Sequence, residues 1–185
     1  MSARSILFAL SIFLLASATR TDESAKNLEV MLDATLEKLT DLKYITILSL
    51  KTTVLPLGVF KNATSYVSVY DRSLFQYSDL FLIVSGDCFS GLDHVSRPEN
   101  QAHLQRASRI IVLEPNSICY NETDGGKANT LLYARVLSKL ESPLKLWYVF
   151  KTPTNVQVIA GAYWNSDTEA KFYDIGISSL NSSLM

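Results

Sequence analysis

The chain has 185 residues, 48% of them hydrophobic, and its formal net charge at pH 7 is −1. This length and apolar content suit one packed domain and exclude an intrinsically disordered chain. Lys and Arg are scattered along the sequence and form no basic stripe, so we expect no nucleic-acid partner.

The N-terminus has the pattern of a secretory signal peptide over residues 1–18. Arg4 supplies a positive charge, residues 6–15 form an apolar core, and residues 16–18 match a small-residue cleavage site. An uncleaved anchor is the alternative. No later stretch approaches the roughly 20 apolar residues of a membrane span, so we expect no membrane insertion by this chain alone. We therefore expect one extracellular domain over residues 19–185, secreted or on the extracellular face of the plasma membrane.

A helix and two strands are predicted in the N-terminal part. Apolar residues recur at helical spacing over residues 24–42, which indicates an amphipathic helix. Residues 44–50 are rich in β-branched side chains and residues 65–70 alternate in polarity, so both indicate strands, the second at a sheet edge. The intervening residues 53–60 contain Pro and Gly and are interpreted as a loop or a short helical turn.

Two apolar runs, residues 80–84 and 109–113, are predicted to be the central strands. Neither shows polar alternation along its apolar residues, which is typical of a parallel strand covered on both faces. Turn-forming residues stop both runs. The only two cysteines, Cys88 and Cys119, lie just beyond these stops.

The cysteines are predicted to form a disulfide. If the two strands are parallel neighbours, both thiols emerge at the same edge of the sheet. The crosslink would close a loop of about 30 residues, which stabilises by about 3–4 kcal/mol in the chain-entropy model. Two buried free thiols are the alternative, but the signal peptide directs the chain to an oxidising compartment, which favours the disulfide.

Loops and helices are predicted to follow each central strand. We expect a loop at residues 89–97, and Pro98 fits the first position of a helix that runs to about residue 107. A second loop, residues 120–127, precedes a helix over residues 128–140, whose apolar positions again recur at helical spacing.

The C-terminal part contains one ambiguous segment. Residues 144–150 fit a strand or a helical turn, and we favour the helix because residues 155–160 then supply the next strand. Residues 171–177 are a candidate last strand. The alternation of strands and helices predicts an α/β fold class: an open, mostly parallel sheet with helices on both faces, like one lobe of a periplasmic binding protein.

Three Asn-x-Ser/Thr sequons, at Asn62, Asn121 and Asn181, predict N-glycosylation. Asn62 and Asn121 lie in polar, turn-like segments, where an acceptor would be exposed. Asn181 lies near the chain end.

The sequence shows no catalytic constellation. Asp93 and His94 are adjacent and stand near Ser90 and Ser96, but a Gly-x-Ser-x-Gly elbow is missing and neighbouring loop residues rarely form a triad. The spacing of Asp93, His94 and His103 fits no zinc-ligand pattern. We therefore predict no enzymatic activity, no metal and no cofactor.

Acidic residues end both central strands, where open sheets bind ligands. Asp87 and Glu114 either point into a cleft or are simply polar strand ends. No residue is assigned to ligand binding.

Four segments of the chain resemble one receptor family. They are the Ser-Asp pair and apolar strand at residues 78–84, the arginine-led strand at 109–113, the Leu-Trp pair at 146–147 and the Asn-Val-Gln-Val-Ile strand at 155–159. This order resembles the extracellular amino-terminal region of arthropod ionotropic receptors, which are chemosensory relatives of ionotropic glutamate receptors. The resemblance extends over residues 24–175.

The resemblance implies a non-catalytic recognition domain whose partners are receptor subunits or a small ligand. The family's channel helices and two-lobed ligand-binding domain have no counterpart in these residues. The chain would then be a truncated product, a fragmentary gene model or an isolated ectodomain, and it would conduct no ions. No ligand-binding residue of the family carries over. The alternative is a free secreted glycoprotein that binds a small ligand or acts as an effector.

Overall fold

The computed structural model describes residues 23, 25–36, 39, 42–50, 66–72, 77–120, 123, 126–140, 145–152, 156–166, 169–172 and 176–179. The predicted signal peptide, the predicted loop at residues 53–60 and the three sequons Asn62, Asn121 and Asn181 lie outside these residues.

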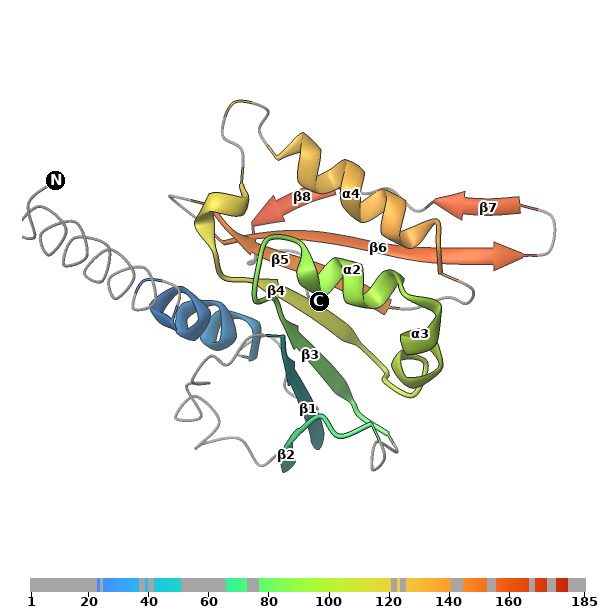
Figure 1. Cartoon of the computed structure of the whole chain (residues 1–185), viewed down its shortest axis with the longest axis horizontal. Coiled ribbons are helices and arrows are strands. Elements are labelled where there is room, and N and C mark those ends of the chain that lie inside the picture. The colour runs from blue at the N-terminus through green and yellow to red at the C-terminus, as the bar shows by residue number, and fades with distance from the viewer. Residues whose placement is uncertain are drawn as a thin grey trace, which may run out of the picture.

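The described strands form one sheet (Figure 1). Its strand order is β2-β1-β3-β4-β5-β6-β7, with β8 pairing with β6. Strands β1 to β5 are parallel, and β6 is antiparallel to β5, β7 and β8. The strands are β1 (Tyr44–Ser49), β2 (Tyr66–Val69), β3 (Leu80–Val84), β4 (Ile110–Glu114), β5 (Lys145–Lys151), β6 (Val156–Ser166), β7 (Glu169–Phe172) and β8 (Gly176–Ser179).

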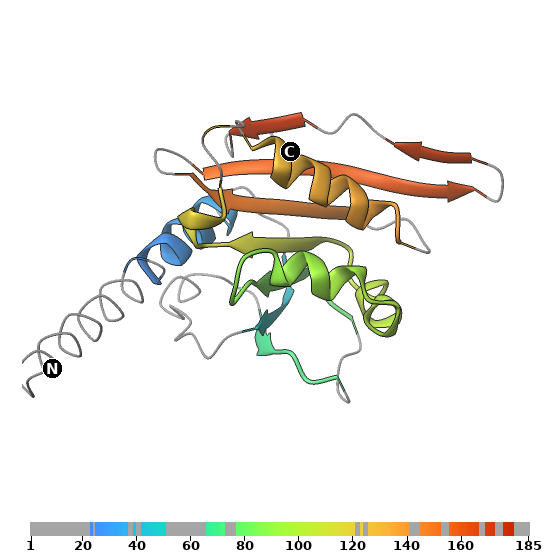
Figure 2. The ribbon, with the colours of Figure 1, turned by 45° about the horizontal axis from the view of Figure 1, so that its top comes forward.

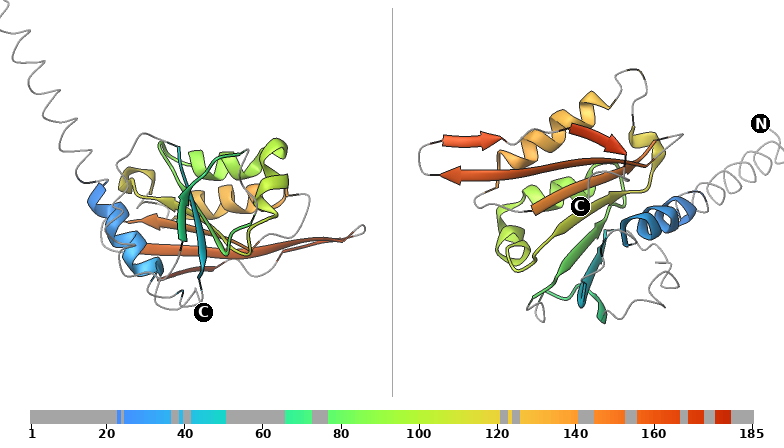
Figure 3. Two further views of the ribbon diagram at one scale, coloured as in Figure 1. Left: turned by 90° about the horizontal axis from the view of Figure 1, so that it is seen from below. Right: turned by 180° about the vertical axis from the view of Figure 1, so that it is seen from behind.

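The described helices lie on both faces of the sheet (Figure 3). Helices α2 (Ser90–Ser96), α3 (Pro98–Leu104) and α4 (Lys127–Leu137) cover one face, and the N-terminal helical residues 25–36 pack against the other. Figure 2 shows α2 and α4 side by side over the strands. The predicted α/β fold class, with helices on both faces of a mostly parallel sheet, is confirmed.

The centre of the sheet is the parallel pair β3 and β4. The pair is in register from Phe81 with Ile110 to Val84 with Leu113, and every residue of both strands is buried. Successive side chains point to opposite faces, so each strand serves two cores. Phe81 and Ile83 pack under α2 to α4, whereas the alternate residues pack against residues 25–36. A strand buried on both faces has no need of polar alternation, which is why its sequence is continuously apolar.

Several other predicted elements are confirmed within the described residues. β1 and β2 match the predictions for residues 44–50 and 65–70, and β2 lies at an edge of the sheet. Pro98 occupies the start of α3, as expected from its missing N–H. The N-terminal helix is shorter than predicted, because Leu39 and Leu42 are no longer helical.

The predicted loop at residues 89–97 is wrong, because this segment forms α2. Leu92 and Val95, one helical turn apart, are fully buried against the sheet. Polar residues surround these two anchors, and the helix is only seven residues long, so the apolar period is too short to be read from the sequence.

The preferred helix at residues 144–150 is also wrong, because this segment forms strand β5. Its side chains alternate between the two cores: Tyr148 and Phe150 join one, whereas Val149 joins the other. β5 therefore takes the place in the parallel sheet predicted for residues 155–160. Those residues belong to β6, which returns antiparallel to β5.

Gly91 lets α2 approach the sheet closely. A Cβ atom at this position would stand 2.5 Å from Val112 Cγ1 and 2.6 Å from Ser85 Oγ. Both distances are far below van der Waals contact, and both neighbours belong to the buried sheet region. A side chain here would have to push the helix off the strands.

We therefore predict that Gly91→Ala lowers the free energy of unfolding by about 1–3 kcal/mol, the usual cost of overpacking a core. Chemical denaturation of the purified protein measures this. Ser96→Ala in the same helix is the control and should change stability by about 0.5 kcal/mol or less. Equal stability of Gly91→Ala and the wild type would show that α2 does not pack as described.

Candidate functional site

The carboxyl edge of β3 and β4 is closed by a disulfide. Cys88, just after β3, is bonded to Cys119, the last residue of the short 3₁₀ helix η2 (Ser117–Cys119), and their Cα atoms are 5.3 Å apart. The predicted disulfide is confirmed. It ties together the two chain segments that leave the central strands.

Glu114, the last residue of β4, lies beneath the loop that carries Cys88. Its side chain is 1% exposed, and its Oε2 accepts a 2.8 Å hydrogen bond from the Phe89 amide. Phe89 has a φ of 66°, a left-handed conformation that is rare for a bulky residue and costs about 1–3 kcal/mol. Partial burial of its ring against the core and the hydrogen bond to Glu114 offset that strain.

Ser85 completes the closure of this edge. Its amide donates to the Leu113 carbonyl at 2.9 Å, which extends the β3–β4 ladder. Its Oγ accepts a 3.1 Å hydrogen bond from the Gly91 amide in the first turn of α2. Strand, loop and helix are thus bound to one another around the disulfide.

Burial raises the pKa of Glu114 to about 7, because water no longer solvates the ionised carboxylate. The Phe89 amide, the Ser85 hydroxyl and the Asn116 amide favour the charged form and partly oppose this shift, whereas the negative charge of Asp87 adds to it. The Oε1 atom of Glu114 is buried and makes no hydrogen bond of normal geometry.

A second buried polar group adjoins this region. Asn129, in the first turn of α4, donates from Nδ2 to the Cys119 carbonyl and to Tyr148 Oη, both at 3.4 Å. Burial raises the pKa of Tyr148, and the charge of Glu114 raises it further. These contacts join α4 and β5 to the disulfide region, so polar groups as well as apolar packing fix the carboxyl edge.

The two acidic strand ends do not line a common open cleft. Asp87 is exposed, whereas Glu114 is buried below the Phe89 loop. The sequence left two interpretations of these residues open, and this geometry agrees with the one in which they are simply polar strand ends. Glu114 acts as a buried anchor for the Phe89 loop.

The hydroxyl and acidic side chains near His94 in the sequence form their hydrogen bonds and ion pair within α2 and the residues directly before and after it. Ser90 Oγ donates to the Asp87 carbonyl at 2.9 Å, and Ser96 Oγ donates to the Asp93 carbonyl at 2.9 Å. Asp93 forms an exposed ion pair with Arg97. These bonds direct the hydroxyls to the backbone, not to the His94 ring.

His103 lies elsewhere, on α3. Its Nε2 accepts a 2.9 Å hydrogen bond from Arg72 Nε. Burial lowers the pKa of His103, and the positive charges of Arg72 and Arg106 lower it further. Within the residues that the structure describes, no cluster of three or more His, Cys, Asp or Glu side chains is arranged to hold a metal ion.

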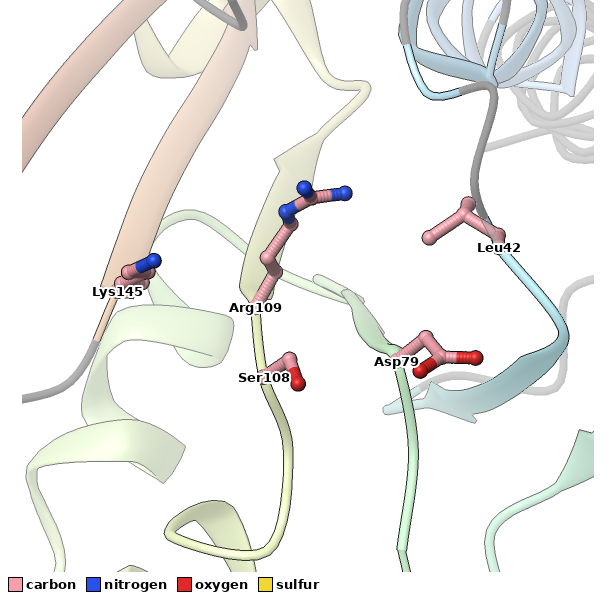
Figure 4. A pocket seen from close by; sticks show the side chains of 5 residues that line it. All are labelled: Leu42, Asp79, Ser108, Arg109 and Lys145. Carbon is pink, nitrogen blue, oxygen red and sulfur yellow. The ribbon is translucent and has the colours of Figure 1, made fainter.

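The amino edge of the same sheet, in contrast, carries a small pocket of about 200 Å³. Its polar lining comes from the residues at the starts of three adjacent strands (Figure 4). The lining residues are Leu42, Asp79, Ser108, Arg109 and Lys145.

Two of these residues are fixed by contacts that also hold the strand starts together. Asp79 Oδ2 accepts hydrogen bonds of 2.9 Å from the amides of Lys43 and Tyr44, at the start of β1. Ser108 Oγ shares a 2.6 Å hydrogen bond with Tyr77 Oη. These hydrogen bonds hold the backbone beneath the pocket in place.

This pocket is not among the sites predicted from the sequence. The signal was present, because Asp79, Arg109 and Lys145 each stand at the start of an apolar run. In a parallel sheet such residues meet at one edge. Recognising Lys145 required residues 144–150 to be read as a strand.

Comparison with known protein families, with curated proteins and with solved structures finds no match to this chain. Among the residues that the structure describes, no helix combines the length and apolar character needed to cross a bilayer.

We predict that stability falls as the pH rises from about 4.5 to about 7, because the unfolded chain then releases the Glu114 proton while the folded protein retains it. The pKa difference corresponds to a loss of about 3 kcal/mol, which is complete above the folded-state pKa. Glu114→Gln should remove this part of the pH dependence, as measured by denaturation at a series of pH values.

Glu99→Gln, which alters an exposed carboxyl on α3, is the matched control for Glu114→Gln. Identical pH profiles for the wild type and Glu114→Gln would mean that Glu114 titrates as a solvated carboxyl.

Proposed function

We propose that this chain is an extracellular recognition domain that acts by binding and not by catalysis, related to the amino-terminal region of chemosensory ionotropic receptors. Three features support this proposal: the disulfide, the parallel α/β sheet and the pocket lined by charged groups. The segment pattern at residues 78–84, 109–113, 146–147 and 155–159 supplies the link to the receptor family.

The disulfide is the observation that carries the extracellular part of the proposal. Structural disulfides form and persist in oxidising compartments and are rare in the cytosol. Here the bond joins the exits of the two central strands, where it supports the fold. Together with the apolar N-terminal segment, it favours a protein made for the secretory pathway.

The chemistry of the pocket favours recognition of a small polar ligand or of a polar surface. Carriers of apolar cargo enclose it in a pocket lined mainly by apolar side chains. Among the described residues, the amino-edge pocket instead brings together Asp79, Arg109 and Lys145, with Leu42 as an apolar wall. This composition supports a receptor-type binding domain over a carrier of hydrophobic compounds.

We predict that insect cells that express the chain release it into the medium with N-glycans attached and with Cys88 bonded to Cys119. The double variant Cys88→Ser/Cys119→Ser should be about 3–4 kcal/mol less stable and should be secreted in lower yield. Secreted yield, mobility after glycan removal and thiol titration are the measurements. Retention of the wild type in the cytosol with two reactive thiols would refute an extracellular function.

Long-read sequencing of the transcript separates the receptor proposal from the free secreted alternative. A reading frame that continues into channel helices and a two-lobed ligand-binding domain supports a receptor. An abundant message that stops after residue 185 favours a free secreted glycoprotein.

A further inference from the structure

The segment that follows the edge strand β2 is attached to the rest of the molecule at two places. The Tyr70 amide donates to the Ile47 carbonyl at 2.8 Å, which continues the pairing of β2 with β1. Arg72 then reaches α3, where its Nε donates to His103 Nε2 at 2.9 Å and its Nη2 donates to the Glu99 carbonyl at 2.6 Å. The Arg72 side chain therefore connects the edge of the sheet to α3.

The hydrogen bond from Arg72 fixes the protonation state of His103. An arginine guanidinium has only donors, so the Nε2 atom of His103 must present its lone pair. The ring proton then lies on Nδ1, which is buried and makes no hydrogen bond. Because an imidazolium has a proton on both nitrogens, the contact can exist only while His103 is neutral.

The surroundings of His103 also oppose its protonation. Burial of the ring has the largest effect in lowering the pKa of His103, and the positive charges of Arg72 and Arg106 lower it further. The carboxylates of Asp71, beside Arg72 in the sequence, and of Glu99, on α3, are not among the charges that shift this pKa. Protonation would place the His103 Nε2–H against the Arg72 Nε–H, donor to donor and cation to cation.

We infer that Arg72 and His103 form an acid-released latch, which holds the segment after β2 on α3 at neutral pH and releases it when His103 is protonated. Histidine suits this role because its ordinary pKa lies in the range through which endosomal sensors respond. The latch goes beyond the proposed binding function, since neither residue is among the described residues that line the amino-edge pocket.

Acidification weakens the latch, whereas it stabilises the carboxyl edge. Since the folded-state pKa of His103 is lowered, the unfolded chain binds this proton first as the pH falls. The stabilisation is complete above the ordinary histidine pKa of about 6.5 and is lost as the pH falls through the lower folded-state value. Protonation of Glu114 has the opposite sign, because its folded-state pKa is raised. A loss of order after β2 on acidification therefore cannot come from Glu114.

Hydrogen–deuterium exchange of the secreted protein at about pH 7.5 and about pH 5, corrected for intrinsic exchange rates, tests the latch. We expect the protection of the peptide that contains Tyr70 and Arg72 to fall by about two- to tenfold at the lower pH, the value of one hydrogen bond. His103→Gln provides an amide oxygen that accepts at both pH values, so its protection should not fall. His94→Gln, which removes the other histidine of the chain, is the matched control and should retain the wild-type loss.

Nitrogen NMR of the imidazole rings examines the same contact in the wild type. We expect His103 to carry its proton on Nδ1 at neutral pH. Arg72→Met should raise the pKa of His103, because it removes both the donor and a positive charge.

Three outcomes overturn the inference. They are a proton on Nε2 of neutral His103 in the wild type, unchanged protection of the wild type at the lower pH, and the same acid-induced loss in His103→Gln as in the wild type. If His103→Gln fails to fold, the position of the ring proton in the wild type decides.

Discussion

The structure depends on the parallel pairing of β3 and β4 and on the covalent bond between their exits. Each strand is buried on both faces, so the pair joins the two hydrophobic cores of the described domain. Cys88 and Cys119 then fix the loops that leave the strands, and α2 begins directly after the first of these loops. A shift in register of one residue would exchange the two core faces and separate the cysteines.

The two edges of the sheet have different characters as a consequence. At the carboxyl edge, where open α/β sheets usually bind ligands, the disulfide, the strained Phe89 and the buried Glu114 form a closed structure. At the amino edge, the strand starts bring charged residues around a small pocket. The carboxyl edge is therefore the closed, covalently linked edge of the sheet, and the amino edge is the one that carries the pocket.

The central strands and the disulfide were predictable because their signals are local and strong. An unbroken apolar run, a turn and a cysteine follow one another at two places in the chain. α2 was not predictable, because its anchors Leu92 and Val95 span a single turn among polar residues. β5 was misassigned because a strand buried on both faces has the same composition as a buried helix. The pocket was missed because of that error. Lys145 lies beside Arg109 only when β5 is a strand.

Peptide mapping of the unreduced, secreted protein by mass spectrometry tests the central claim most directly. The account predicts one crosslinked pair of peptides, one containing Cys88 and the other Cys119, that separates on reduction. Alkylated free cysteines, or a disulfide between two copies of the chain, would contradict the side-by-side, parallel arrangement of the strand exits on which the fold and both edges depend.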